Sequence, residues 1–107
     1  MARIQIPFQG RWREPMLQGI KTCTSRNRCY GGVGDAFEVF GAMFQLTMVI
    51  KVCLSTVAGG LFREEGCHSP REFIDVWVSL HPRKGWDNKQ EVWVHHFEKL
   101  KADGNGF

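Results

Sequence analysis

The sequence predicts a small α+β domain of about five mostly antiparallel strands that close into a barrel beside two or three short helices. Residues 44–54 alternate apolar and polar side chains, as a strand with one face in a core does. Residues 69–72 read Ser-Pro-Arg-Glu, which is typical of a helix start. The remaining segments show no regular alternation of strand and helix, which argues against a doubly wound parallel sheet and leaves a small barrel.

The length of 107 residues suits one domain spanning 1–107, with a flexible tail expected over 99–107. The hydrophobic fraction of 43% and the charged fraction of 23% are typical of globular domains, and eight Phe and four Trp allow a well-filled core. A net charge of +3 permits nucleic-acid binding without requiring it.

The sequence contains no apolar run of membrane-spanning length and no signal-peptide pattern, so we expect a cytoplasmic protein. The four cysteines form no Cys-x-x-Cys pair. Two disulfides are arithmetically possible, but in a cytoplasmic protein reduced thiols are expected.

The first half of the chain predicts two strands and a helix before residue 44. Residues 3–8 alternate like a strand, which we place at a sheet edge because Pro7 has no N–H to donate. A short helix begins at Glu14-Pro15 and ends at Gly19, a typical cap residue. Residues 36–40 form the second predicted strand, and 44–54 the third. The third strand is expected to bury one face, formed by Phe44, Leu46, Met48, Ile50, Val52 and Leu54.

The second half predicts helices followed by a closing strand. A short helical turn begins at residue 55, and the helix after Ser69 ends at His81-Pro82. Its expected buried face consists of Phe73, Val76, Trp77 and Leu80. Residues 91–97 are almost continuously apolar, which indicates a central strand.

The segment Gly19-Ile20-Lys21-Thr22-Cys23-Thr24-Ser25-Arg26 concentrates cations and hydroxyls after the first helix. In an extended segment, one face carries residues 21, 23 and 25, and the other carries residues 22, 24 and 26. A turn or bulge after the helix would bring Lys21 and Thr24 toward one pocket. Such a pocket suits an anion, a carbonyl oxygen or a nucleotide, whereas the simpler interpretation is a polar surface loop.

Two other site chemistries fit the sequence poorly. The Gly-rich segment 30–35 lacks the Gly-Lys-Ser/Thr ending of a phosphate-binding P-loop. Cys67-His68 and His95-His96 lack the usual spacing of zinc ligands. We therefore expect neither a metal site nor a cofactor.

The order of these motifs resembles the ASCH family of the PUA-like superfamily. The resemblance runs from Pro7 to Phe97. It rests on Gly19-x-Lys21-Thr22-x-Thr24-x-Arg26, Gly34-Asp35-x-Phe37, Glu65-Gly66-x-x-Ser69 with Phe73 and Trp77, and Val94-His95-x-Phe97. It implies a small β-barrel with flanking helices and a cleft lined by the Lys-Thr segment.

The resemblance also implies activities. One small single-domain subgroup hydrolyses the amide of N4-acetylcytidine and related N4-acylated cytosines, and its Lys-Thr-x-Thr-x-Arg motif is intact here. Its downstream acidic residue aligns best with Glu65, with Glu64 as a near rival. Other members resemble RNA-binding modules or ribonucleases.

Amide hydrolysis by this motif would use Thr24 as nucleophile and Lys21 as its base, if burial and the nearby Arg26 favour the neutral amine. Glu65 would hold Lys21 or pass a proton to the departing N4. Thr22, Arg26 and Tyr30 would bind the substrate, a modified cytosine nucleoside.

The alternative is a non-catalytic module for single-stranded RNA, since cations and aromatic residues are interleaved as in single-strand binders. Its expected contacts are Arg28, Arg83, Lys84 and Trp86.

Overall fold

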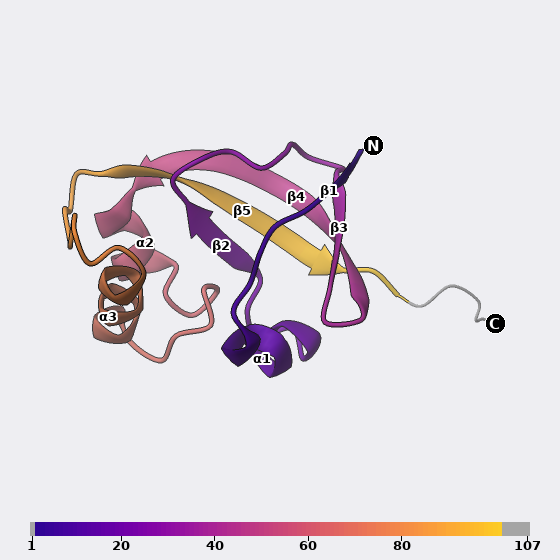
Figure 1. Ribbon diagram of the computed structural model, residues 1–107, viewed down its shortest axis with the longest axis horizontal. Helices are drawn as coiled ribbons and strands as arrows, with labels where there is room; N and C mark the ends of the chain where they lie inside the picture. Colours follow the sequence, from indigo (N-terminus) through magenta and orange to yellow (C-terminus); the bar gives the residue numbers. More distant parts are fainter. Residues whose placement is uncertain (1, 102–107) are drawn as a thin grey trace.

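The computed structural model describes residues 2–101 and contains one five-stranded sheet. The strands are β1 (Arg3–Ile4), β2 (Cys23–Arg26), β3 (Ala36–Val39), β4 (Ala42–Cys53) and β5 (Glu91–Lys99), in the order β1-β3-β4-β5-β2. Strands β1 and β3 are parallel and every other pair is antiparallel. Figure 1 shows β4 and β5 as the long strands of the sheet. The predicted α+β class and mostly antiparallel sheet are confirmed, and β5 is central as predicted.

The predicted closure into a barrel is wrong, because β1 and β2 remain the two edges of an open sheet. Strand β1 has only two residues and β2 only four, so neither offers a long ladder to the other. The predicted first strand over 3–8 stops at Ile4, and its continuation leaves the sheet. Ile6 on this continuation is buried, and Phe8 packs on Phe37 and Phe97.

The helical segments are η1 (Gly10–Trp12), α1 (Arg13–Leu17), α2 (Leu54–Gly60) and α3 (Pro70–Leu80). Helices α2 and α3 gather near one end of the long strands (Figure 1). The predicted helix start is confirmed, since Ser69 Oγ accepts a 3.1 Å hydrogen bond from the Glu72 N–H. The Glu72 carboxylate accepts a 2.8 Å hydrogen bond from the N–H of His68, the residue before Ser69. Phe73 and Trp77 are buried, whereas Leu80 is exposed, contrary to prediction.

Strand β4 departs from its predicted alternation in the middle. Leu46 pairs with Phe97 but Met48 pairs with His96, so a β-bulge lies between them. A bulge adds one residue and shifts the side chains that follow to the opposite face. Phe44 and Leu46 are therefore buried, whereas Met48 and Ile50 are 46% and 43% exposed. The prediction of one continuous core face over 44–54 is therefore wrong at Met48 and Ile50, whereas Val52 packs against the core and Leu54, the first residue of α2, is buried.

The first two residues of the predicted flexible tail, 99 and 100, are joined to the sheet. Lys99 is part of β5, and the Leu100 N–H donates to the carbonyl of Met43. Residues 102–107 of that prediction lie outside the described residues. Within residues 2–101, no helix is long and apolar enough to cross a membrane.

Candidate active site

The turn after α1 carries Lys21 into the interior. Gly19 ends the helix with a φ of +76°, a conformation that glycine adopts without strain. The N–H of Lys21 then donates to the carbonyl of Pro15. As a result Lys21 is 2% exposed, which is unusual for a lysine and requires partners for its charge.

The loop before α3 lies against the start of β2. The N–H groups of Thr22 and Cys23 both donate to the carbonyl of Glu64, at 2.7 and 3.0 Å. This contact turns the next side chain, Glu65, toward Lys21, while the Glu64 side chain stays exposed. Of the two acidic residues that the sequence left open, Glu65 is the one that lies at the site.

Lys21 and Glu65 form a buried ion pair. Lys21 Nζ lies 3.3 Å from Glu65 Oε1 and 2.8 Å from each of two carbonyl oxygens, those of Cys23 and Glu65. The ammonium also lies 4.6 Å from the ring centroid of Trp12, a cation–π contact. These three acceptors use all three N–H groups of a lysine ammonium, so the site holds Lys21 as a cation.

Gly66 lets this pair approach the Trp12 ring. Its φ is +93°, and an added Cβ would lie 2.9 Å from Trp12 Cζ3 and 3.2 Å from Lys21 Cβ. Both the backbone conformation and the available space therefore favour glycine beside Glu65.

The Glu65 carboxylate has further donors on the same face of β2. Ser25 Oγ donates to Glu65 Oε2 at 2.6 Å, and Cys23 Sγ lies 3.7 Å from the same oxygen. Burial and the nearby carboxylate raise the pKa of the Cys23 thiol, which keeps it protonated. Residues 21, 23 and 25 thus share one partner, as the predicted alternation requires.

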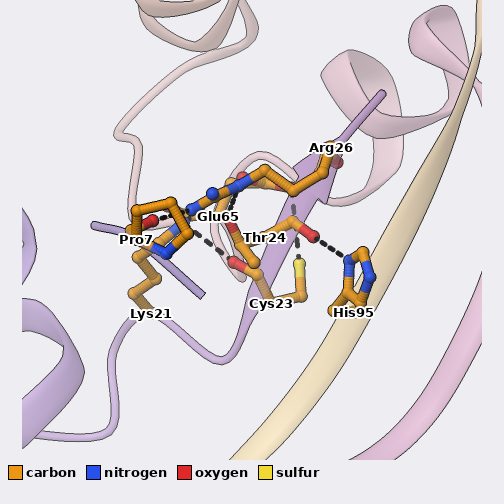
Figure 2. A network of polar contacts seen from close by, with 8 residues as sticks. Pro7, Lys21, Cys23, Thr24, Arg26, Glu65 and His95 are labelled. Atoms are coloured by element: carbon orange, nitrogen blue, oxygen red, sulfur yellow. Dashed lines mark hydrogen bonds and ion pairs between the residues drawn. The ribbon is translucent and has the colours of Figure 1, made fainter. Parts of the chain in front are cut away.

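The other face of β2 carries Thr24 and Arg26. Arg26 Nε donates to Thr24 Oγ1 at 3.2 Å, and Nη2 donates to the carbonyl of Pro7 at 2.6 Å (Figure 2). The guanidinium also lies 4.9 Å from the Phe8 ring centroid and 5.7 Å from that of Tyr30. Burial lowers the pKa of Arg26. Among residues 2–101 no carboxylate forms an ion pair with it, so its charge is available to a ligand.

His95 on β5 fixes the position of Tyr30. The Tyr30 N–H donates to His95 Nε2 at 3.0 Å, and His95 Nδ1 lies 3.3 Å from the carbonyl of Thr24. These contacts select the neutral ring with its proton on Nδ1. Burial lowers the pKa of His95, which agrees with this tautomer.

These groups meet at a cavity of about 610 Å³ between β2, the N-terminal segment and α3. Its polar wall includes Lys21, Thr24, Ser25, Arg26 and Glu65. Its aromatic and other lining residues include Phe8, Trp12, Arg28, Tyr30, Phe73, Trp77 and His81.

Most of the predicted site residues line this cavity, but four do not. Thr22 lies outside the wall, where its carbonyl accepts from the Phe97 N–H. Arg83 and Lys84 are exposed, and Trp86 packs on Phe73 while its indole N–H donates to Asn88. The predicted contact between Lys21 and Thr24 is also absent from the hydrogen bonds of the described residues, since Lys21 is engaged with Glu65 and Thr24 with Arg26.

Sequence reasoning missed Ser25, Trp12, Phe8 and His95. Ser25 could have been found, because the alternation already placed it on the face of Lys21. Trp12 and Phe8 carry no local signal, since their approach depends on how the N-terminal segment crosses the sheet.

Metal ligands do not gather in the described part of the chain, where no three His, Cys, Asp or Glu side chains form a cluster that could hold an ion. Cys67 lines the cavity, and burial raises the pKa of its thiol to about 11. His68 next to it is exposed and pairs with Glu72.

Comparisons with known proteins identify the fold. No protein-family model and no curated protein sequence matches the chain. The structure is similar to the hypothetical protein PH0355, with a TM-score of 0.71 and 15% identity over 94% of this chain and 100% of that one. It is also similar to an ASCH domain from Lactobacillus crispatus, with a TM-score of 0.66 and 13% identity over 92% of this chain and 78% of that one.

The chain has the fold of ASCH domains. A further likeness is to the ZmASCH protein from Zymomonas mobilis, with a TM-score of 0.60 and 9% identity over 94% of this chain and 76% of that one. The predicted ASCH fold is therefore confirmed at the level of architecture, without the closed barrel.

Proposed function

We propose that this protein is an ASCH-type amidohydrolase that hydrolyses the N4-acyl amide of N4-acetylcytidine-type nucleosides. The observation that carries the proposal is the buried Lys21–Glu65 pair in the wall of a cavity. A buried ion pair is costly to desolvate and seldom adds net stability, so its presence at a cavity favours a chemical role.

The cavity suits a nucleoside in size and lining. Its volume of about 610 Å³ lies within the range of small-molecule sites. Phe8 and Tyr30 supply aromatic surface for contact with a pyrimidine, and the Arg26 guanidinium lies over both rings. A neutral base with an exocyclic amide is compatible with such a mixed wall.

In this proposal Glu65 handles the proton and Lys21 supports it. Hydrolysis of an amide requires that a proton leaves the nucleophile and reaches the departing nitrogen. A carboxylate can do both, and Lys21 Nζ lies 3.3 Å from Glu65 Oε1. We therefore assign Glu65 as general base and then acid, and Lys21 as its electrostatic partner rather than as the predicted base.

Thr24 and Arg26 act on the carbonyl side. Arg26 is held by Thr24 Oγ1, by the Pro7 carbonyl and by a side-chain hydrogen bond with Tyr30, which leaves part of its five-donor guanidinium for a ligand. A fixed cation directed at the amide oxygen would stabilise the oxyanion that forms during attack. The Thr24 hydroxyl, which accepts from Arg26, has its own proton available for the same oxygen.

The test is turnover of N4-acetylcytidine by the purified protein, with cytidine and acetate as products. Glu65→Gln should reduce kcat by at least about 10²-fold, because general acid–base catalysis typically contributes that much. Glu64→Gln is the matched control, since the Glu64 side chain is exposed and should be dispensable. No turnover over a panel of N4-acylated cytosines would refute the proposal.

A second candidate function is RNA binding or cleavage, which one arrangement favours. The Arg28 guanidinium lies 4.2 Å from the ring centroid of Tyr30, and Arg26 lies on the same ring at 5.7 Å. Cations around an aromatic ring suit a stacked base with its neighbouring phosphate.

This candidate predicts affinity for single-stranded RNA that falls steeply with salt. Arg28→Ser should weaken binding and reduce the salt dependence. Affinity that is unchanged between low and high salt would count against it, and nucleoside turnover without RNA binding would favour the amidohydrolase.

A further inference from the structure

The hydroxyl nearest to the proposed base is that of Ser25. Its Oγ donates to Glu65 Oε2 at 2.6 Å, a length typical of charge-assisted O–H···O⁻ hydrogen bonds. Ser25 is 7% exposed and Glu65 is 5% exposed, yet both side chains line the cavity. The proton of Ser25 therefore already points at a carboxylate within reach of a bound ligand.

Thr24 lacks this arrangement. Its Oγ1 accepts from Arg26, and no hydrogen bond in the described chain joins it to Glu65 or Lys21. Lys21 has no lone pair to offer, because its three N–H groups are all directed at acceptors. A hydroxyl needs an adjacent base to become a nucleophile, and only Ser25 of the two has one.

We propose that Ser25 is the nucleophile of the reaction and that catalysis proceeds through an acyl-Ser25 intermediate, an inference that rests on the proposed amidohydrolase function. Ser25 Oγ bonds to the acyl carbon while its proton passes to Glu65 Oε2, and the carbonyl electron pair moves onto oxygen. The C–N4 bond then breaks, and the proton on Glu65 moves to N4 of the leaving cytosine.

Water completes the cycle. It bonds to the acyl carbon and passes one proton to Glu65, and the ester bond to Ser25 Oγ breaks. The proton on Glu65 returns to Ser25 Oγ, and the carboxylic acid leaves. The two faces of β2 thus have different roles. Ser25, with Glu65 and Lys21, supplies the nucleophile, whereas Thr24 and Arg26 bind the oxyanion. Figure 2 shows Lys21, Glu65 and Arg26 around the strand.

The experiment compares Ser25→Ala, Ser25→Cys and Thr24→Ala with Ser55→Ala, a control at an exposed serine of α2. N4-acetylcytidine is the substrate, and acid-quenched protein is digested and sequenced by tandem mass spectrometry. We expect acetylated Ser25 in the wild type at steady state and a loss of kcat of at least about 10³-fold in Ser25→Ala. Thr24→Ala should slow turnover but still form acyl-Ser25, and Ser55→Ala should behave as wild type.

The outcomes separate the two proposals. A wild type without turnover refutes the amidohydrolase and this inference with it. A wild type that turns over, beside a folded Ser25→Ala variant within tenfold of it, overturns the nucleophile and leaves the function standing. Acetylation found on Thr24 does the same. If Ser25→Ala does not fold, Ser25→Cys decides: an acetyl thioester on Cys at that position supports the inference, and its absence in an active variant overturns it.

Discussion

Two regions of the chain combine cations with polar or aromatic side chains: residues 19–26, here called the β2 segment, and the loop after α3, residues 81–90. Their cations differ in burial. Lys21 on the first is almost fully buried and has three acceptors. Arg83 and Lys84 on the second are exposed, and Trp86 beside them packs on the core. The cations of the β2 segment line the cavity, whereas those of the loop face water.

This difference shows what distinguishes a candidate site from a charged surface. An exposed cation interacts weakly because water screens it, whereas a buried one acts strongly on whatever enters beside it. The sequence shows clustered Lys and Arg residues in both regions, so this clustering does not distinguish a site from a charged surface. Burial with specific partners is the property that separates them, and variants in both regions test it, from the largest expected effect to the smallest.

The largest effect is expected from Lys21→Met. Removing one partner of a buried pair leaves the Glu65 charge uncompensated, which costs about 3–5 kcal/mol of unfolding free energy. The double variant Lys21→Met with Glu65→Leu should recover much of that stability while remaining inactive. Urea unfolding of the three proteins measures this, and a single variant that loses under about 1 kcal/mol would show that the pair is not desolvated as described.

A smaller loss is expected from Gly66→Ala. The variant forces a Cβ against the Trp12 ring at a φ of +93°, so we expect a loss of roughly 1–3 kcal/mol. Gly59→Ala in α2 is the matched control, because nothing lies within 4 Å of its added Cβ and alanine favours a helix. Equal unfolding midpoints for the two variants would contradict the close approach of Gly66 to the Trp12 ring and the Lys21 side chain.

The parts of these regions that sequence reasoning could predict are the ones set by local patterns. The start of α3 follows from Ser69 and Glu72 within one turn, and the two faces of β2 follow from simple alternation. The predicted faces also gave the correct grouping of residues 21, 23 and 25, which share Glu65.

The parts that could not be predicted depend on contacts between distant segments. Lys21 and Glu65 are 44 residues apart, and only the family resemblance joined them beforehand. The sequence of β4 does not indicate its bulge. Met48 and Ile50 continue the apolar alternation although their side chains are exposed. The open edges of the sheet likewise follow from how the N-terminal segment leaves the sheet after Ile4, which residue types alone do not dictate.

A pH-dependent effect is expected from His95, which supports the cavity from β5. Burial lowers its pKa in the folded chain below the ordinary value of 6.5, so the unfolded chain binds the proton more tightly. Stability should therefore fall as pH is lowered through about 6.5 and continue to fall until the folded pKa is reached. Protonation would also place a second N–H against the Tyr30 N–H and release Tyr30 from the cavity wall.

Urea midpoints between pH 7.5 and 5.5, which span the ordinary histidine value of about 6.5, measure this effect. His95→Gln is the informative variant, since its amide can still donate to the Thr24 carbonyl and accept from Tyr30. Burial also lowers the pKa of His96, which contributes with the same sign, so the difference between wild type and His95→Gln isolates His95. Parallel pH profiles would show that His95 is not the group responsible.

The smallest effect is expected from the double change Arg83→Ser and Lys84→Ser. Both side chains are exposed and lie outside the cavity wall, so unfolding free energy should stay within about 0.5 kcal/mol of wild type and nucleoside turnover should not change. Arg28→Ser is the comparison, because that guanidinium lies on Tyr30 in the wall and its loss should raise KM. A double variant that impairs turnover more than Arg28→Ser would reverse the contrast between the two regions. A loss of RNA affinity confined to the double variant would assign the exposed loop to RNA and the cavity to a separate ligand.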